Sequence, residues 1–173
     1  EFEAGLLSLI HRLQDGQSYI APQPEPVISL ERQQFLVPDR QDLPPPFTYA
    51  KFIMGPEQQR TTGYTEASRV CKHLCRHCPI VPVYTGRFRI VRHDVVLEDI
   101  RQQVAAGVEH MTFGDPDFFN GIGHAIPLVQ ALHAEFPHLT YDVTIKIEHL
   151  LRYAEHLPTL RETGCVLITS AVE

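Results

Sequence analysis

Hydrophobic positions in the second half of the chain alternate between the spacing of β-strands and that of α-helices. Short apolar and β-branched runs predict strands at residues 64–70, 108–113, 140–146 and 165–170. Apolar residues three or four positions apart predict helices at residues 94–106, 125–136 and 150–157. This alternation is typical of βαβ units, so we expect an α/β fold with about four parallel strands. Because a closed barrel needs more strands, the expected architecture is a partial (β/α) barrel.

The N-terminal third of the chain follows a different pattern. Apolar residues between positions 6 and 13 have helical spacing, and Gly16 follows where such a helix would end. Eight of the fourteen prolines lie in the first 60 residues, which is typical of an extended connector. We therefore divide the chain into an N-terminal helix with a Pro-rich linker, 1–62, and an α/β core, 63–173. The chain does not begin with Met, and we expect the rest of the barrel to come from a longer protein or a partner chain.

Composition and charge exclude several classes of protein. The chain is 43% hydrophobic and 21% charged, which is ordinary for a globular protein. Its net charge of −6 argues against general nucleic-acid binding, and it has no run of about 20 apolar residues that could span a membrane. The first residues lack a secretory signal, so we expect a cytoplasmic protein. Residues 61–92 differ from the rest, with six basic residues and one acidic residue, and they include the basic segment Arg87–Arg92.

Three of the four cysteines, Cys71, Cys75 and Cys78, lie in this basic region at the end of the first expected strand. Three neighbouring thiols would leave one unpaired in any disulfide arrangement, so a metal site is the better interpretation. A [4Fe–4S] cluster ordinarily has four cysteine ligands. With three cysteines, one iron would stay open for an external ligand. The surrounding Lys and Arg residues would offset the negative charge of the thiolates and the cluster.

A zinc site is the alternative interpretation of the same cysteines. His73, His77 or His93 would then be the fourth ligand, and the chain would be a zinc-stabilised interaction module without catalytic activity. Zinc motifs usually combine a C-x2-C pair with a second, distant pair, and this sequence has no such second pair. The spacing therefore favours the iron–sulfur cluster.

Polar residues also follow the other expected strands. In parallel α/β folds, ligands bind where loops converge at the C-terminal ends of the strands. The second strand is followed by Gly114-Asp115-Pro116-Asp117, the third by Lys146 and Glu148, and the fourth by Ser170 and Glu173. The expected topology would bring these residues to the same edge of the sheet as the cysteines.

The motif Cys71-x3-Cys75-x2-Cys78 after a first strand, with Gly114-Asp115-Pro116 after the second, resembles that of the radical S-adenosylmethionine (radical SAM) enzymes. The resemblance covers about residues 63–173. It implies that the three cysteines hold a [4Fe–4S] cluster and that S-adenosylmethionine (SAM) binds beside it. It also implies reductive cleavage of SAM to a 5′-deoxyadenosyl radical that abstracts hydrogen from a substrate. An electron donor such as flavodoxin or ferredoxin would be the partner.

The same resemblance implies a set of SAM-binding residues. His77 corresponds to the family's aromatic residue that contacts adenine. The segment from Gly114 to Pro116 corresponds to the family's segment that contacts the SAM amino group. Further candidates are Asp117, Ser170 and Glu173. The sequence does not indicate which residues act on the substrate.

The leader resembles the connector of cobalamin-type radical SAM proteins. The resemblance lies in Glu1-x-Glu3, the amphipathic helix, the Pro-rich linker and Asp42-Leu43-Pro44-Pro45-Pro46. It implies that cobalamin could bind only in a domain upstream of this sequence.

Overall fold

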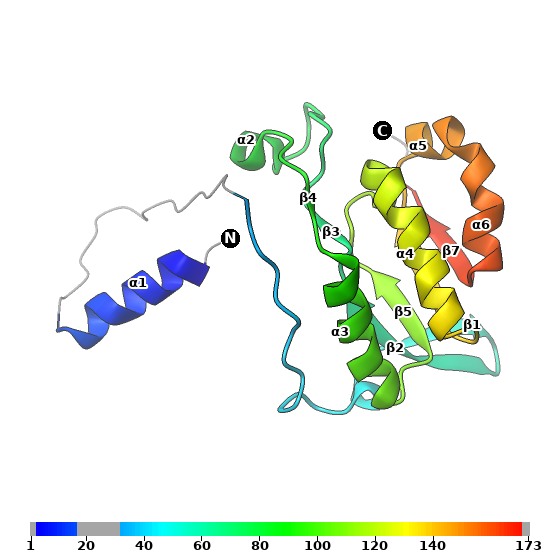
Figure 1. Ribbon diagram of the computed structural model, residues 1–173, viewed down its shortest axis with the longest axis horizontal. Coiled ribbons are helices and arrows are strands. Elements are labelled where there is room, and N and C mark those ends of the chain that lie inside the picture. The colour runs from blue at the N-terminus through cyan, green and yellow to red at the C-terminus, as the bar shows by residue number, and fades with distance from the viewer. Residues whose placement is uncertain (1–2, 17–31, 171–173) are drawn as a thin grey trace.

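Four parallel strands form the main part of a five-stranded sheet in the computed structural model, which describes residues 3–16 and 32–170 (Figure 1). The strands are β1 (Lys51–Gly55), β2 (Gln58–Thr65), β3 (Ser68–Arg69), β4 (Arg89–Ile90), β5 (His110–Phe113), β6 (Thr140–Thr144) and β7 (Cys165–Thr169). The α-helices are α1 (Glu3–Gln14), α2 (Val81–Tyr84), α3 (His93–Ala105), α4 (Ile122–Glu135), α5 (Ile147–Arg152) and α6 (Leu157–Glu162). The 3-10 helices are η1 (Pro46–Thr48), η2 (Phe118–Gly121) and η3 (Ala154–His156).

The sheet has the strand order β1-β2-β5-β6-β7 and curls into half of a barrel. The strands β2, β5, β6 and β7 pair in parallel, and β1 joins β2 as an antiparallel hairpin. Helix α4 links β5 to β6, and α5, η3 and α6 link β6 to β7. The expected α/β fold with four parallel strands is confirmed.

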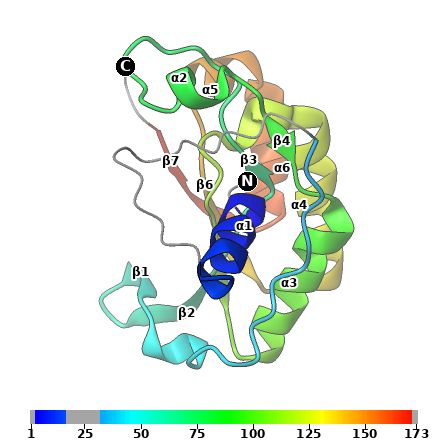
Figure 2. The ribbon, with the colours of Figure 1, turned by 90° about the vertical axis from the view of Figure 1, so that its left-hand side faces the viewer.

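Helices cover one face of the sheet, and the core lies between the two layers (Figure 2). Alternate residues of β5 and β6 point to this side, so Met111 and Val143 are fully buried. Ile100 of α3 and Leu128 of α4 are equally inaccessible and belong to the same cluster. Burying side chains of this size contributes roughly 1.5–3 kcal/mol each, which explains why the apolar periodicity predicted these elements well.

The opposite face of β5 and β6 is polar. His110 has no exposed surface, and its ring stacks on Phe52 of β1 with 3.8 Å between centroids. Its Nε2 lies 2.8 Å from Oδ1 of Asp142, and its Nδ1 lies 2.8 Å from Oγ1 of Thr140. The Thr112 hydroxyl also donates to Asp142, at 2.6 Å. Both ring nitrogens of His110 are satisfied, which gives this histidine a structural role.

The N-terminal helix forms where the sequence predicts it. Helix α1 ends before Gly16, whose φ of 74° favours glycine. Four large apolar residues of the helix are between 39% and 55% exposed, namely Leu6, Leu7, Ile10 and Leu13. No described helix combines the length and hydrophobicity that crossing a membrane requires.

The boundary of the sheet differs from the expected one. Residues 51–62, expected to be linker, form β1 and most of β2. The first part of β2 pairs with β1, and β2 pairs with β5 from Thr62 onward. The preceding segment is attached to the core through Arg40, whose Nε lies 2.6 Å from Oδ1 of Asp99 on α3. Residues 17–31, which contain the first three prolines of the expected linker, lie outside the described residues.

The expected strand at residues 64–70 is also wrong. Strand β2 already ends at Thr65, and Ser68–Arg69 pairs separately with Arg89–Ile90. Beyond the sheet, the carboxylate of Asp115 accepts hydrogen bonds from the backbone N–H of Ala67 and from the side-chain hydroxyl of Ser68.

The helix expected at residues 150–157 is divided. Helix α5 ends at Arg152, and α6 starts again at Leu157, with Pro158 in its first turn. Proline has no N–H to continue a preceding helix but fits the first turn of a new one.

Alanine substitutions at two glycines test how closely the chain segments pack. Gly164 and Gly107 have φ angles of 103° and 97°, so alanine at either site incurs backbone strain of about 1–2 kcal/mol. A Cβ at Gly164 would also lie 2.7 Å from the carbonyl oxygen of Leu139, whereas one at Gly107 meets nothing within 4 Å. Gly164→Ala should therefore lower the free energy of unfolding more than the control Gly107→Ala, measured by urea titration. Equal losses would contradict the close approach at Leu139.

Candidate functional site

The cysteine motif lies in the loop between β3 and α2. Cys71, Cys75 and Cys78 are free thiols, each partly exposed. The loop begins at Val70, whose φ of 64° is unusual for a β-branched residue and costs roughly 1–3 kcal/mol. Such strain persists only where surrounding contacts hold the backbone.

Contacts from two other strand ends hold this loop. The Lys72 ammonium donates to the backbone oxygen of Asn120 in η2 at 2.6 Å, and Sγ of Cys71 lies 3.8 Å from Oδ1 of Asn120. Lys146, directly after β6, places its Nζ 3.6 Å from Sγ of Cys75 and 3.7 Å from Oε2 of Glu148. The loop thus lies against the C-terminal edge of β5 and β6, and two ammonium groups lie close to it.

The positions of the thiols bear on the choice between zinc and a cluster. Among the described residues, only His73, Asp117 and His149 form a group of three possible ligands whose donor atoms lie within 4.8 Å of one another. The three sulfurs are not part of this group. A [4Fe–4S] cluster takes each thiolate on a different iron, and three thiols on one loop supply that donor set with one iron left open.

Two of the histidines considered as fourth zinc ligands have other contacts. His73 lies beside Asp117, with 3.6 Å between Nε2 and Oδ2. Nε2 of His93 lies 3.0 Å from the backbone oxygen of His124, and the two rings are 4.3 Å apart. His77, the third of them, is exposed.

Asp115 connects the end of β5 to the segment that leads into the cysteine loop. Its carboxylate is buried and accepts hydrogen bonds from the backbone N–H of Ala67 at 2.9 Å and from the Ser68 hydroxyl. Burial raises the pKa of Asp115 to about 6, although both hydrogen bonds act in the opposite direction. The preceding Gly114 lies under Tyr64, since a Cβ there would be 1.8 Å from the tyrosine oxygen.

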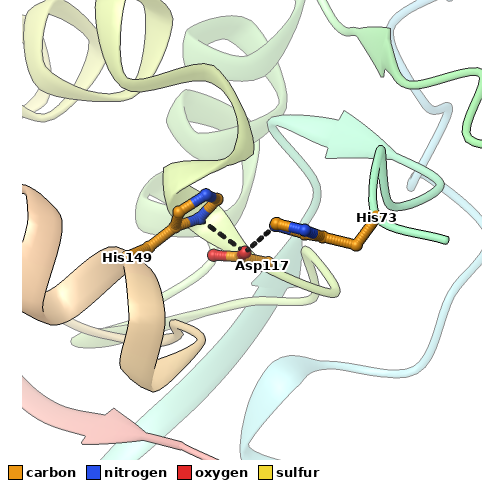
Figure 3. Close-up of side chains that lie close together, drawn as sticks. All are labelled: His73, Asp117 and His149. Carbon is orange, nitrogen blue, oxygen red and sulfur yellow. Dashed lines mark ion pairs between the residues drawn. The ribbon is translucent and has the colours of Figure 1, made fainter. Parts of the chain in front are cut away.

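Asp117 lies beneath the loop and is also buried. Its Oδ1 accepts from the backbone N–H of Phe119 at 3.2 Å and of Lys146 at 3.4 Å. Its Oδ2 lies 2.7 Å from Nδ1 of His149 and 3.6 Å from Nε2 of His73 (Figure 3). Burial lowers the pKa of His149, and the charge of Asp117 opposes this effect in part.

The structure thus brings together some of the residues that the sequence singled out. The cysteine loop, Asp115, Asp117 and Lys146 lie at one edge of the sheet. His77 and Pro116 are exposed, and Gly114 is partly exposed. Ser170 is half-buried, and its hydroxyl oxygen has no hydrogen-bond partner among the described residues, while Glu173 lies outside them.

Sequence reasoning missed four residues that shape this site. Asn120 and Ser68 contact the cysteine loop or its approach, Tyr64 covers Gly114, and His149 contacts Asp117. Asn120 had a local signal, because it follows the second strand three positions after Asp117. His149 had none, because its contact depends on how α5 packs.

Cys165 lies away from the loop, on β7. It packs against the hydrophobic core, and its thiol lies 3.5 Å from the backbone oxygen of Leu167. Burial raises the pKa of this thiol to about 11. It is therefore a suitable control for substitutions in the motif.

The raised pKa of Asp115 predicts a pH dependence of stability. The folded state holds this proton more tightly than the unfolded state, so the free energy of unfolding falls as the pH rises from 3.8 to about 6, by on the order of 3 kcal/mol. Asp115→Asn should remove this fall, because an amide can accept from Ala67 and donate to Ser68. Urea titrations of both proteins at several pH values measure the difference. A parallel pH dependence in the two proteins would contradict the assignment.

The solved structures that share this fold include two of one enzyme. One is the radical S-adenosylmethionine methyltransferase TsrM from Kitasatospora setae with cobalamin and a [4Fe–4S] cluster bound, at a TM-score of 0.52 and 18% identity. The match covers 66% of this chain and 21% of that one. The second is TsrM with tryptophan substrate and the SAM analogue aza-SAM, at a TM-score of 0.51 and 19% identity, covering 64% and 21%.

These likenesses show a radical SAM-like fold, and the chain spans about a fifth of the length of TsrM. No known protein-family profile matches the sequence. No curated protein shows significant similarity to it.

Proposed function

We propose that this chain is part of a radical SAM enzyme in which Cys71, Cys75 and Cys78 hold a [4Fe–4S] cluster. The observation that carries the proposal is the C-x3-C-x2-C loop at the C-terminal edge of a parallel sheet. The likeness of this sheet to that of TsrM supports the proposal independently of the motif. When bound, the cluster supplies the electron that cleaves SAM to methionine and a 5′-deoxyadenosyl radical.

The chain's own residues hold the loop and balance its charge. Lys146 brings a positive charge to 3.6 Å from Sγ of Cys75, and Lys72 adds a second positive charge within the loop, which favours binding of an anionic thiolate-ligated cluster. Asp115 holds the approach to Cys71 at residues 67 and 68. Because these contacts come from residues far apart in sequence, the loop is positioned by the sheet.

For SAM we propose the exposed edge of the turn from Gly114 to Pro116. Both carboxylates of this region are buried and bound to protein groups, so Asp115 and Asp117 would support the turn from behind. His77 is exposed and would contact adenine. Ser170 and Glu173, at the end of β7, remain candidates for the ribose and carboxylate of SAM.

The remaining partners follow from the chemistry. Reductive cleavage needs a one-electron donor such as flavodoxin or ferredoxin. TsrM is described with cobalamin bound, and we propose that any cobalamin here binds a domain outside this sequence. Further strands of a longer protein or of a partner chain would complete the barrel.

Substitution of one motif cysteine tests the ligand assignment. Cys75→Ala should lose most of the iron and sulfide that the wild-type chain takes up on anoxic reconstitution, expected at about four of each per chain, because two thiolates do not retain the cluster. The measurements are iron and sulfide content and the electron paramagnetic resonance spectrum of the reduced protein.

Cys165→Ala is the matched control and should keep the wild-type content, since this thiol lies in the core. Full iron content in Cys75→Ala would overturn the ligand assignment. Stoichiometric zinc without sulfide in the wild-type chain would overturn the cluster itself. Release of 5′-deoxyadenosine from SAM by the reduced chain tests the proposed reaction.

A further inference from the structure

Three polar side chains from separate segments meet directly beneath the cysteine loop (Figure 3). His73 comes from the loop, Asp117 follows β5, and His149 belongs to α5. Their side chains are 19%, 3% and 2% exposed, respectively. One donor atom of each lies within 4.8 Å of the other two, so the group could surround a single ion.

The three converging atoms lack hydrogen bonds. Nε2 of His73, Oδ2 of Asp117 and Nδ1 of His149 are inaccessible and have no hydrogen-bond partner among the described residues. Nδ1 of His149 and Oδ2 of Asp117 lie 2.7 Å apart and form an ion pair when His149 is protonated, but this contact does not meet the geometry of a hydrogen bond. A buried polar atom without a partner costs roughly 1–3 kcal/mol, so three at one point call for a ligand between them.

The distances are close to those found around a metal ion of the first transition series. Imidazole and carboxylate ligands bind such ions at about 2.0–2.2 Å, which places neighbouring ligand atoms roughly 3–3.5 Å apart. The two separations from Oδ2, 2.7 Å to His149 and 3.6 Å to His73, lie on either side of this range. Two ligand atoms that share an ion also point toward the ion and not toward each other. Their contact therefore lacks hydrogen-bond geometry, as is found for His149 and Asp117.

The surroundings of Asp117 direct one oxygen toward this point. The backbone N–H groups of Phe119 and Lys146 both donate to Oδ1, which leaves Oδ2 facing the two imidazoles. Hydrogen bonds of this kind orient ligating carboxylates in metal sites. Two imidazoles and one carboxylate are ligands for zinc and for ferrous, cobaltous or manganous ions.

We propose that His73, Asp117 and His149 bind one divalent ion of the first transition series, at a site separate from the three cysteines. The ion ties the cysteine loop to the end of β5 and to α5. This site goes beyond the proposed function and does not depend on it, because none of its ligands is a sulfur.

The test uses Co²⁺ as the probe and the full chain with Cys71, Cys75 and Cys78 all replaced by alanine, under anoxic conditions. This protein should bind one Co²⁺, with visible ligand-field bands and without thiolate-to-cobalt charge-transfer absorption. Adding His149→Gln should weaken Co²⁺ binding by more than about tenfold. Removing a residue that only orients a metal ligand already weakens binding by about that factor, and a direct ligand should matter more. His138→Gln, at an exposed histidine, is the matched control and should leave Co²⁺ binding unchanged.

Two results would overturn the site. One is absence of Co²⁺ binding by the cysteine-free chain when its circular dichroism and unfolding transition match those of the wild type. The other is equal Co²⁺ affinity with and without His149→Gln. If the cysteine-free chain does not fold, the same comparison is made in the chain with intact cysteines. There, His149→Gln should lower the number of bound Co²⁺ ions by one per chain. An unchanged number would overturn the site.

The two proposals can fail separately. Iron and sulfide in the wild-type chain report on the cysteines, whereas Co²⁺ in the cysteine-free chain reports on the histidines and Asp117.

Discussion

The hydrogen bonds from Ala67 and Ser68 to the buried carboxylate of Asp115 are the interaction on which the candidate site depends. They hold residues 67 and 68 just after β2 ends at Thr65, in the segment that leads to the cysteines. Without them, the buried backbone N–H of Ala67 and the buried hydroxyl of Ser68 would need other acceptors. Burial raises the pKa of Asp115, so keeping its carboxylate ionised there costs free energy. The same carboxylate fixes the start of the loop through its two hydrogen bonds.

A second carboxylate, Asp117, makes similar contacts two residues further along the chain. It contacts the loop at His73 and the next strand connection at His149 and Lys146. Asp115 therefore holds the approach to the cysteines, and Asp117 supports the loop from beneath. The sequence resemblance alone would assign both aspartates to SAM, but in the structure both carboxylates are buried and contact protein groups.

The half-barrel also explains why the two faces of the sheet differ. The face beneath α3 and α4 is apolar and closely packed, as a parallel sheet covered by helices requires. On the other face, His110, Asp142 and their threonine neighbours form a satisfied polar network under Phe52. The hairpin partner β1 thus contributes to the stability of the central strands, although its segment resembles a linker in sequence.

The sequence by itself determined three of the four parallel strands, the main helices and the cysteine motif. These features are local, because the periodicity of apolar residues and the spacing of three thiols are set by neighbours within a few positions. Only the tertiary structure decided where β2 ends, that residues 51–62 join the sheet, and that His73, Asp117 and His149 meet. Each of these depends on contacts between residues tens of positions apart, which the curling of the sheet and the packing of α5 bring together.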